Sequence, residues 1–518
     1  MKDSSEITIP DHVSQRVPIW ALVILGLVTA TIVFLTLQFV FRIGIFHIGT
    51  LTFDDSVTAA NRDFITNTID SIQLDGDVTI SASQSFTSPT DPHTLIFDVL
   101  VPVTDFYNPL LAISAEQLAN LATGQDIAGV ELLSIWNLKP DFRLLAVDEI
   151  YYLDTLSSGA VFNTITISGR DSDVKRITSL LSDAVQQPPT NEEILTLAQT
   201  GVTALSRHIN TALLNGDPET IATDFAKYIG SYLSSFDLTH TSNEASFSKA
   251  ASGNNICANP VMINTLTAIG LDIVELTGNH NQDCGDDDAI STIDLYAAQG
   301  IKTFGGGKTA TSAAEALNID QKDTKLTLLG YNFSTGGYTL DNTPGANFYT
   351  EKQAIADISN AKENNRKVIV DIQYYECNEY DNTNDSRICD YADSSAGDQI
   401  SFFRHLIDLG ADVVVGTSAH QPQTFELYED GVIYYGLGNL FFDQSFWPGT
   451  TRSLILVHYF YHNQLIQTRI VPTVYDSTYQ TKLMETSDAS AFLKRLISAR
   501  PWNHYSRPTQ TAATSDLA

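Results

Sequence analysis

The chain has 518 residues, too many for one ordinary domain, and this length predicts two globular units with additional segments. Its 29 Lys and Arg residues are outnumbered by 61 Asp and Glu residues, which gives a formal net charge of −32. This balance argues against nucleic acid and anionic lipid as ligands, because both would be repelled. An acidic polymer would need a local basic patch, and none is visible in the sequence.

The first predicted element is an apolar helix at residues 19–42, which follows a polar tail at 1–18. The run WALVILGLVTATIVFLTLQFVF carries no charge between Arg16 and Arg42, and about 20 apolar residues cross a bilayer. A cleaved signal peptide is the alternative, but its apolar region spans only about 7–15 residues and ends at a small-x-small site. We therefore expect one uncleaved membrane anchor, with the bulk of the chain outside the cell membrane.

Residues 43–190 predict a small α/β domain. Its expected elements alternate between strand and helix: Thr94–Phe106, Ala115–Thr123, Leu144–Val147 and Ala160–Ile167. A capping box of Ser114 and Gln117 marks the start of the helix. This region resembles a lobe of periplasmic substrate-binding proteins, and the alternative is a spacer without a ligand. Two prolines in QQPPTNEE, residues 186–193, indicate the linker that follows.

Residues 195–476 predict a second and larger α/β domain. Helices are expected at Ile290–Gln299 and Gln399–Leu409, and strands at Leu271–Leu276, Leu326–Tyr331, Val368–Gln373 and Ala411–Val415. A hairpin near the end is expected to turn at His462 and Asn463. Residues 477–518 form a C-terminal extension whose polar end is expected to be disordered.

Polar side chains follow the predicted strand at Leu271–Leu276. The stretch ELTGNHNQDCG presents Asn279, His280 and Asp283 together. An amide, an imidazole and a carboxylate at the carboxyl end of a strand suit a metal or a phosphate-like ligand. The alternative is that Asn279 and His280 only cap the helix that starts near Asp287.

Two later stretches favour a functional site. GTSAHQPQ contains His420, and YYGLGNLFFDQ contains Asn439 and Asp443. With the first stretch, they resemble the motifs of the CapA family of capsule and poly-γ-glutamate synthesis proteins, a branch of the calcineurin-like metallophosphatase superfamily. The resemblance spans roughly residues 195–476. It implies a four-layer α/β/β/α sandwich with the site at the strand ends.

The resemblance also implies roles for individual residues. Asn243 and Glu244, in LTHTSNEASF, match the family's Asn-x-Glu segment loosely. His280 and His420 would be the acid/base pair, and Glu244 would act as general base or orient the ligand. A metal ion would be held by Asn279, His280 and His420. The remaining candidates would contact substrate or orient these groups: Asn243, Asn279, Asp283, Asn439 and Asp443.

Three positions depart from the family's ligand pattern. Val202 stands where the first Asp is usual, Gln373 stands in place of a His, and Ser418 replaces one of two paired His. Valine cannot coordinate a cation, and glutamine is a poor ligand beside imidazole. We therefore expect one divalent metal ion or none, rather than a two-metal centre.

The functional prediction is synthesis, export or attachment of capsule or poly-γ-glutamate, with hydrolysis or transfer at an amide or phosphoester bond. Other capsule-synthesis proteins would be partners. One alternative is a non-catalytic surface protein that binds an anionic polymer or small ligand, and another is a phosphoesterase.

Four cysteines allow three pairings. Outside the cell we expect Cys257 with Cys284, near the site, and Cys377 with Cys389.

Overall fold

The computed structural model describes residues 49–333, 336–374, 399–446 and 448–499. The predicted anchor at 19–42, the expected pair Cys377 and Cys389, and the polar tail lie outside these residues. Within the described ranges, no helix combines the length and the apolar character needed to cross a membrane.

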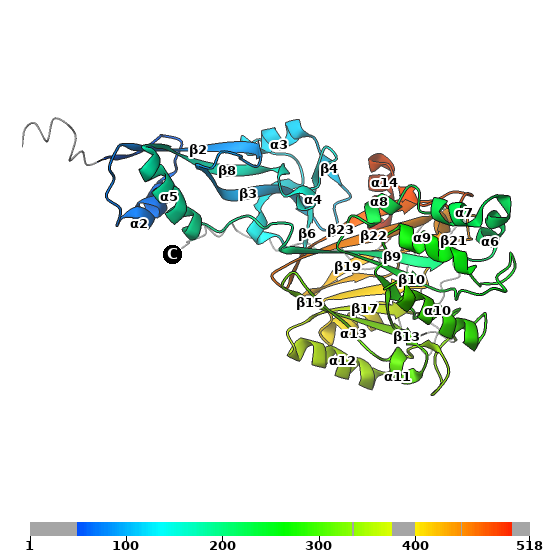
Figure 1. Ribbon diagram of the computed structural model, residues 1–518. Coiled ribbons are helices and arrows are strands. Elements are labelled where there is room, and N and C mark those ends of the chain that lie inside the picture. Colours follow the sequence, from blue (N-terminus) through cyan, green and yellow to red (C-terminus); the bar gives the residue numbers. More distant parts are fainter. Residues whose placement is uncertain (1–48, 334–335, 375–398, 447, 500–518) are drawn as a thin grey trace, which may run out of the picture. The chain divides into compact units, whose positions relative to one another are not determined.

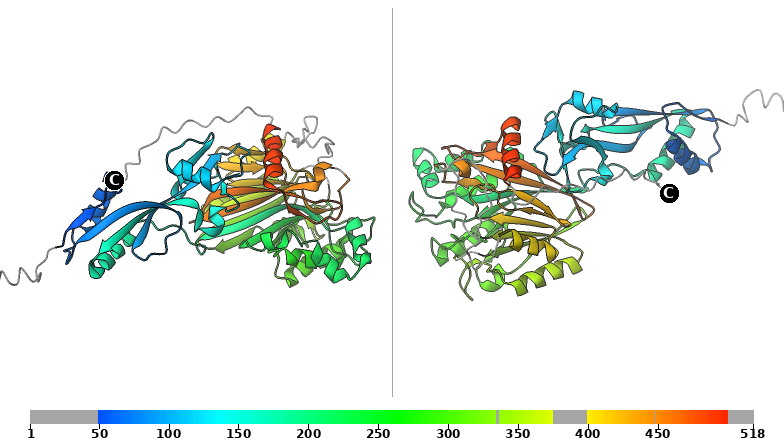
Figure 2. Two further views of the ribbon diagram at one scale, coloured as in Figure 1. Left: turned by 90° about the horizontal axis from the view of Figure 1, so that it is seen from above. Right: turned by 180° about the vertical axis from the view of Figure 1, so that it is seen from behind.

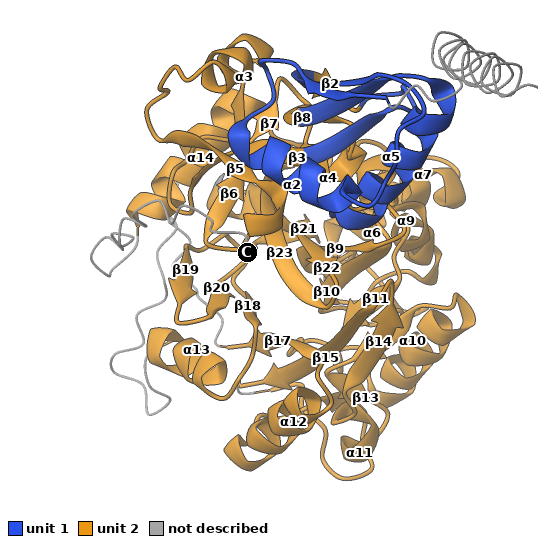
Figure 3. Cartoon of the chain, turned by 90° about the vertical axis from the view of Figure 1, so that its left-hand side faces the viewer, with its two compact units in different colours: residues 1–85, 89–97, 163–187 blue, residues 86–88, 98–162, 188–518 orange. Residues whose placement is uncertain are grey.

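The chain divides into two compact units (Figure 3). Unit 1 comprises residues 1–85, 89–97 and 163–187, and unit 2 comprises residues 86–88, 98–162 and 188–518. One division falls inside the predicted linker, between Gln187 and Pro188. Residues 98–162, expected to belong to the small domain, group with unit 2 instead.

Unit 1 consists of strands of one sheet and two helices. Its elements are β1 (Leu51–Phe53), α2 (Ala59–Ile69), most of β2 (Val78–Thr87), parts of β3 (Thr94–Asp105) and β8 (Ser158–Gly169), and α5 (Asp171–Ala184). The sheet has the order β1-β2-β8-β3, continued by β5 (Val130–Ser134) and, beside β3, β6 (Phe142–Leu144). Ile65 of α2 and Ile177 of α5 share one buried cluster with Ile80 of β2, so both helices pack on the sheet.

The segment 98–162 is held to the rest of unit 2 by partly buried polar contacts. It contains β4 (Ala112–Ile113), α3 (Ala115–Ala122), η1 (Ile135–Asn137), β7 (Ala146–Val147) and α4 (Tyr152–Thr155). The predicted capping box of α3 is present in full. The carboxylate of Asp154 accepts a hydrogen bond from the hydroxyl of Tyr459 at 2.5 Å and pairs with Arg469 at 2.8 Å. Tyr459 and Arg469 both belong to unit 2, so these contacts join the segment to the larger unit.

An eight-stranded sheet forms the first half of the larger α/β fold, with the order β12-β11-β10-β9-β22-β23-β24 and β21 beside β9. Its strands are β9 (Ile194–Ala204), β10 (Leu238–Asn243), β11 (Ile273–Glu275), β12 (Lys302–Phe304), β21 (Asn439–Phe442), β22 (Arg452–Tyr461), β23 (Gln464–Val474) and β24 (Lys482–Leu483). Strands β12 to β9 and β21 run parallel. The hairpin of β22 and β23 turns at His462 and Asn463, as predicted.

A six-stranded sheet forms the second half, with the order β14-β15-β17-β18-β20-β19. Its strands are β14 (Leu317–Gln321), β15 (Thr324–Asn332), β17 (Lys367–Gln373), β18 (Val413–Thr417), β19 (Phe425–Tyr428) and β20 (Gly431–Tyr434). The four inner strands are parallel, and the outer two are antiparallel to them. The expected strands at 326–331, 368–373 and 411–415 all fall in this sheet.

The remaining elements connect and cover the sheets. They are α6 (His208–Ala212), η2 (Leu213–Asn215), α7 (Pro218–Asp224), α8 (Gly230–Leu233), η3 (Pro260–Met262), α9 (Ile263–Ala268), α10 (Asp286–Ala298), β13 (Gly306–Gly307), α11 (Ala310–Ala313), β16 (Gly345–Ala346), α12 (Glu351–Glu363), α13 (Gln399–Asp408), η4 (Pro448–Thr451) and α14 (Thr486–Ser498). Helix α14 packs on β23 (Figure 2).

Side-chain alternation along β17 divides the core between two layers. Val368, Val370 and Ile372 join a cluster with α12 and α13, which lie along one face of the six-stranded sheet (Figure 1). Ile369 joins a different cluster, which contains residues of both sheets, including Leu197 of β9. The two sheets therefore share one hydrophobic core.

A buried polar network crosses this shared core. Asp371, two residues after Ile369, accepts a hydrogen bond from the amide of Gln199 on β9. The Gln199 oxygen lies 3.1 Å from Nε2 of His458, and Nε2 of His240 lies 3.4 Å from the other Asp371 oxygen. Burial lowers the pKa of both histidines to about 3. Burial, with the nearby Glu275, raises the pKa of Asp371 well above its usual range, so His240 and Asp371 meet as a neutral pair.

Candidate functional site

Three parallel strands meet at one edge of the eight-stranded sheet, where β9 and β10 end and β21 begins. Val202 of β9 is in register with Ser242 of β10 and with Asn439 of β21. The preceding residue must be glycine, because a Cβ on Gly201 would lie 2.0 Å from the carbonyl oxygen of Gly438. The GLGN loop can therefore approach β9 closely, and it places Asn439 beside Val202.

The corresponding edge of the six-stranded sheet places three polar side chains side by side. Asn332, Gln373 and Thr417 are in register on β15, β17 and β18. The Gln373 amide donates to Oδ1 of Asn279 at 3.1 Å, and the Thr417 hydroxyl donates to the Gln373 oxygen at 3.3 Å. The predicted residue Asn279 is thus linked to the position where the family has a histidine.

The loop after β11 orients His280 through Asp283. Nδ1 of His280 lies 2.8 Å from a carboxylate oxygen of Asp283, and both side chains are partly exposed.

The helix-capping alternative for Asn279 and His280 is wrong. Helix α10 begins after Gly285, which has φ 97° and provides no side-chain cap.

Glu244 is buried beside the same loop. Its backbone N–H donates to the carbonyl of Thr203 at 2.9 Å, at the end of β9. A Cβ on Gly278 would lie 2.8 Å from Cγ of Glu244, so the Glu244 side chain packs directly against the residue before Asn279. Asn243 donates its side-chain amide to the carbonyl of Ala245 at 2.9 Å, which stabilises this turn.

His420 is buried and oriented by Asn439. The Asn439 amide nitrogen donates to Gln444 Oε1 at 3.0 Å and to the Thr450 carbonyl at 3.2 Å. Both partners are acceptors, so the Asn439 oxygen must be the atom that lies 2.9 Å from Nδ1 of His420. In the neutral ring Nδ1 therefore carries the proton, and Nε2 is the basic nitrogen. The ring also stacks on Phe442, with centroids 4.8 Å apart.

Asp443 contacts a second set of residues, which the sequence analysis did not predict as site residues. One oxygen lies 2.7 Å from Nδ1 of His208 and 3.6 Å from Nε of Arg207, and the other accepts from the Tyr479 hydroxyl at 3.0 Å. The Arg207 guanidinium lies over the ring of Phe442 at 4.8 Å. The sequence carried no periodic or motif signal for Arg207, because its partner is 236 positions away.

The predicted site residues therefore form two linked groups. Glu244 and Asn279 lie together beside Gln373, whereas His420, Asn439 and Asp443 lie together around Phe442. The groups adjoin because Asn243 and Phe441 are both in register with Thr203. His280 and His420 are each oriented by their own neighbours, and the convergence of their two rings in one cleft stays a prediction.

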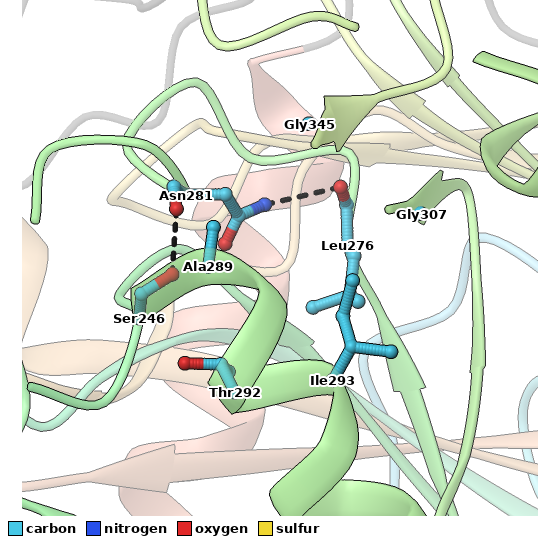
Figure 4. A pocket seen from close by; sticks show the side chains of 8 residues that line it. All are labelled: Ser246, Leu276, Asn281, Ala289, Thr292, Ile293, Gly307 and Gly345. Carbon is cyan, nitrogen blue, oxygen red and sulfur yellow. Dashed lines mark hydrogen bonds between the residues drawn. The ribbon is translucent and has the colours of Figure 1, made fainter. Parts of the chain in front are cut away.

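A small cavity lies under the Asn279–Asp283 loop (Figure 4). Its volume of about 20 Å³ has room for about one water molecule. Its lining includes Ser246, Asn281 and Thr292, and the Ser246 hydroxyl donates to the carbonyl of Asn281 at 2.5 Å. None of the predicted catalytic residues lines it, and it is too small for a substrate. Its lining residues hold the loop in place.

The disulfide between Cys257 and Cys284 confirms one predicted pairing. It joins the Asn279–Gly285 loop to the segment that follows Glu244.

The residues present do not fit the superfamily's two-metal centre. The Val202 side chain is buried and apolar, and Ser418 is buried with φ 77°. The Asn279 oxygen, a predicted ligand, accepts the Gln373 amide instead. Across the described part of the chain, no three His, Cys, Asp or Glu side chains lie close enough together to hold a metal ion.

Parallel strands of two sheets that end in an Asn-His loop, a Gly-x-x-x-His loop and a Gly-Asn loop define a metallophosphatase-like α/β protein. Residues 196–444 match the model of one family of this class, the bacterial capsule synthesis protein PGA_cap. This match confirms the CapA resemblance predicted from the motifs, over the part of the chain that it covers.

Two curated relatives have related descriptions. The chain is 24% identical over 295 residues to the capsule biosynthesis protein CapA of Bacillus anthracis, a match that covers 54% of this chain and 67% of the relative. It is 28% identical over 218 residues to the PGA biosynthesis protein CapA of Bacillus subtilis (strain 168), covering 41% of this chain and 53% of the relative. A crystal structure of a hypothetical protein from Thermus thermophilus aligns at 12% identity with a TM-score of 0.32, over 54% of this chain and 99% of that one.

Proposed function

We propose that this protein acts at the cell surface in the synthesis, export or attachment of a capsule polymer of the poly-γ-glutamate type. Support comes from the family domain at residues 196–444 and from relatives described by capsule and PGA biosynthesis. In this proposal residues 19–42 anchor the chain, the remainder lies outside the membrane, and other capsule-synthesis proteins are its partners. The domain would have the four-layer α/β/β/α arrangement of metallophosphatases.

The orientation of His420 is the observation that carries a catalytic role. Asn439 keeps the proton on Nδ1, so Nε2 is the nitrogen that would accept a proton from a nucleophile or return it to a leaving group. The substrate would be an amide bond of the polymer, and the reaction would be hydrolysis or transfer to an acceptor amine. Glu244 and Asn279 would orient the substrate. No step of this proposal runs through a metal ion.

The test is turnover of poly-γ-glutamate by the full chain in detergent, followed as polymer length and released amine. We expect His420→Gln to lower the rate by about 100-fold or more, since acid–base catalysis contributes that much. His405→Gln is the matched control, because this histidine of α13 pairs with Glu351 on the neighbouring helix at 2.7 Å. Equal rates for wild type and His420→Gln would contradict the catalytic role.

The alternative is a protein that binds the polymer without cleaving it. The replacement of three ligand positions by Val202, Gln373 and Ser418 favours this alternative. It predicts that the wild type retains the polymer on an affinity column while neither polymer length nor free amine changes. Turnover that disappears in His420→Gln would exclude it.

A further inference from the structure

Arg207 has a strained backbone at the edge of the candidate site. Its φ of 50° and ψ of −124° lie in a region that favours glycine. A non-glycine residue held there costs about 1–3 kcal/mol, and such residues concentrate at functional sites. Glycine would form the turn after β9 without this cost, so the side chain of Arg207 supplies something that glycine cannot.

The Arg207 guanidinium is held in place, but few of its N–H groups donate hydrogen bonds to the part of the chain that the structure describes. Its Nη2 donates to the backbone carbonyl of Asp443 at 3.3 Å, while Nε lies 3.6 Å from the Asp443 carboxylate. Nε is buried and has no hydrogen-bond partner within the described residues. A guanidinium has five N–H donors in a fork that matches a carboxylate. Most of this donor capacity is therefore unsatisfied, although the side chain is only 26% exposed.

Phe442 connects the Arg207 guanidinium to the candidate site. Phe442 contacts both the Arg207 guanidinium and the imidazole of His420, at 4.8 Å each. Asp443 is 3% exposed and is also held by His208 and Tyr479, so it acts as a fixed support for Arg207. In a chain of net charge −32, a cation held against the same aromatic ring as the proposed base is an attractive point for an anion.

We propose that Arg207 is the carboxylate-binding residue of this site and holds one carboxylate of an acidic polymer with a carboxylate on every residue. This inference rests on the proposed function, because it assigns the ligand contact of the same site. The bound carboxylate would accept hydrogen bonds from the N–H groups that Asp443 leaves unsatisfied. It would place the neighbouring amide bond near His420.

The test measures binding of a γ-glutamyl tetramer and of free glutamate to the full chain in detergent, by titration calorimetry. Arg207→Gly removes the guanidinium and relieves the backbone, and Arg207→Lys keeps the charge without the fork. We expect the tetramer affinity to fall about 10- to 100-fold in Arg207→Gly and less in Arg207→Lys. Arg495→Gln, which removes an exposed arginine of α14, should bind as the wild type does.

The outcomes separate this inference from the proposed function. A wild type that binds neither ligand would contradict both. A wild type that binds the tetramer as tightly as Arg207→Gly does would overturn the role of Arg207 and leave the proposed function standing. Equal affinity for glutamate and the tetramer would assign the site to a small carboxylate and overturn the polymer contact. Urea unfolding of each variant verifies the fold, and if Arg207→Gly fails to fold, Arg207→Lys decides.

Discussion

Removing the disulfide between Cys257 and Cys284 should destabilise unit 2 by a calculable amount. The bond closes a loop with a sequence separation of 27 residues. The loss of chain entropy in the unfolded state then corresponds to about 3.5 kcal/mol at 25 °C. Cys257 is buried, so alanine is the suitable replacement at both positions, because serine would place an unsatisfied hydroxyl there.

The assay is urea unfolding of the Cys257→Ala/Cys284→Ala variant, followed by circular dichroism. With a denaturant dependence of about 3 kcal/mol per molar urea, the midpoint should fall by about 1 M. The comparison variant is Cys377→Ala/Cys389→Ala, which removes the other predicted pair and leaves the bond between Cys257 and Cys284 in place. In dithiothreitol, wild type and the Cys257→Ala/Cys284→Ala variant should unfold at the same urea concentration, because neither then has a disulfide.

An unchanged midpoint for Cys257→Ala/Cys284→Ala would refute this reasoning. It would mean that the Asn279–Gly285 loop is ordered by its packing alone. A fall in midpoint together with loss of polymer binding would show that the bond also holds His280 and Asn279 in place.

Three further predictions concern the core and the strand ends. His240 and His458 have pKa values lowered to about 3 from 6.5, so the stability they contribute is present above pH 6.5 and is lost as pH falls toward 3. Each should add a slope of about 1.4 kcal/mol per pH unit in that window, and the His240→Gln/His458→Gln variant should show a shallower pH dependence in thermal unfolding. Burial raises the pKa of Asp371, so its contribution is lost as pH rises through the folded-state value. Asp371→Asn should therefore gain stability relative to wild type as pH rises, and a constant difference across pH would contradict the neutral pair. Gly201→Ala should cost about 3 kcal/mol or more, on the order of a disrupted core, because its Cβ would overlap the Gly438 carbonyl. Gly336→Ala, where a Cβ meets nothing within 4 Å, should leave the unfolding midpoint unchanged.

Local patterns in the sequence were sufficient for most elements of the larger fold. The apolar runs at 326–331 and 368–373 predicted strands, and the structure extends them only to Thr324–Asn332 and Lys367–Gln373. The capping box at Ser114 predicted the start of α3 correctly. These predictions succeeded for the same reason. An apolar run and a capping box are both formed by residues that lie close together in the sequence.

The assignment of residues 98–162 to unit 2 depends on contacts with residues far away in the sequence. Residues 98–162 follow the same strand–helix rhythm as their neighbours, so the sequence offered no reason to separate them. Asp154 pairs with Arg469, 315 residues later, and such a pair leaves no local pattern. Composition likewise could not show that Gln199, His240 and Asp371 meet inside the core.

The candidate site is divided in the same way between local pattern and tertiary structure. By itself, the order of the motifs around Asn279, His420 and Asn439 was enough to predict the family and the edge of the sheets at which polar residues gather. Only the tertiary structure placed Gln373 on Asn279, fixed the tautomer of His420 through Asn439, and set Arg207 against Asp443. The physical reason is that motifs report what each strand end carries, whereas hydrogen bonds and ion pairs between strand ends depend on the register of sheets assembled from the whole chain.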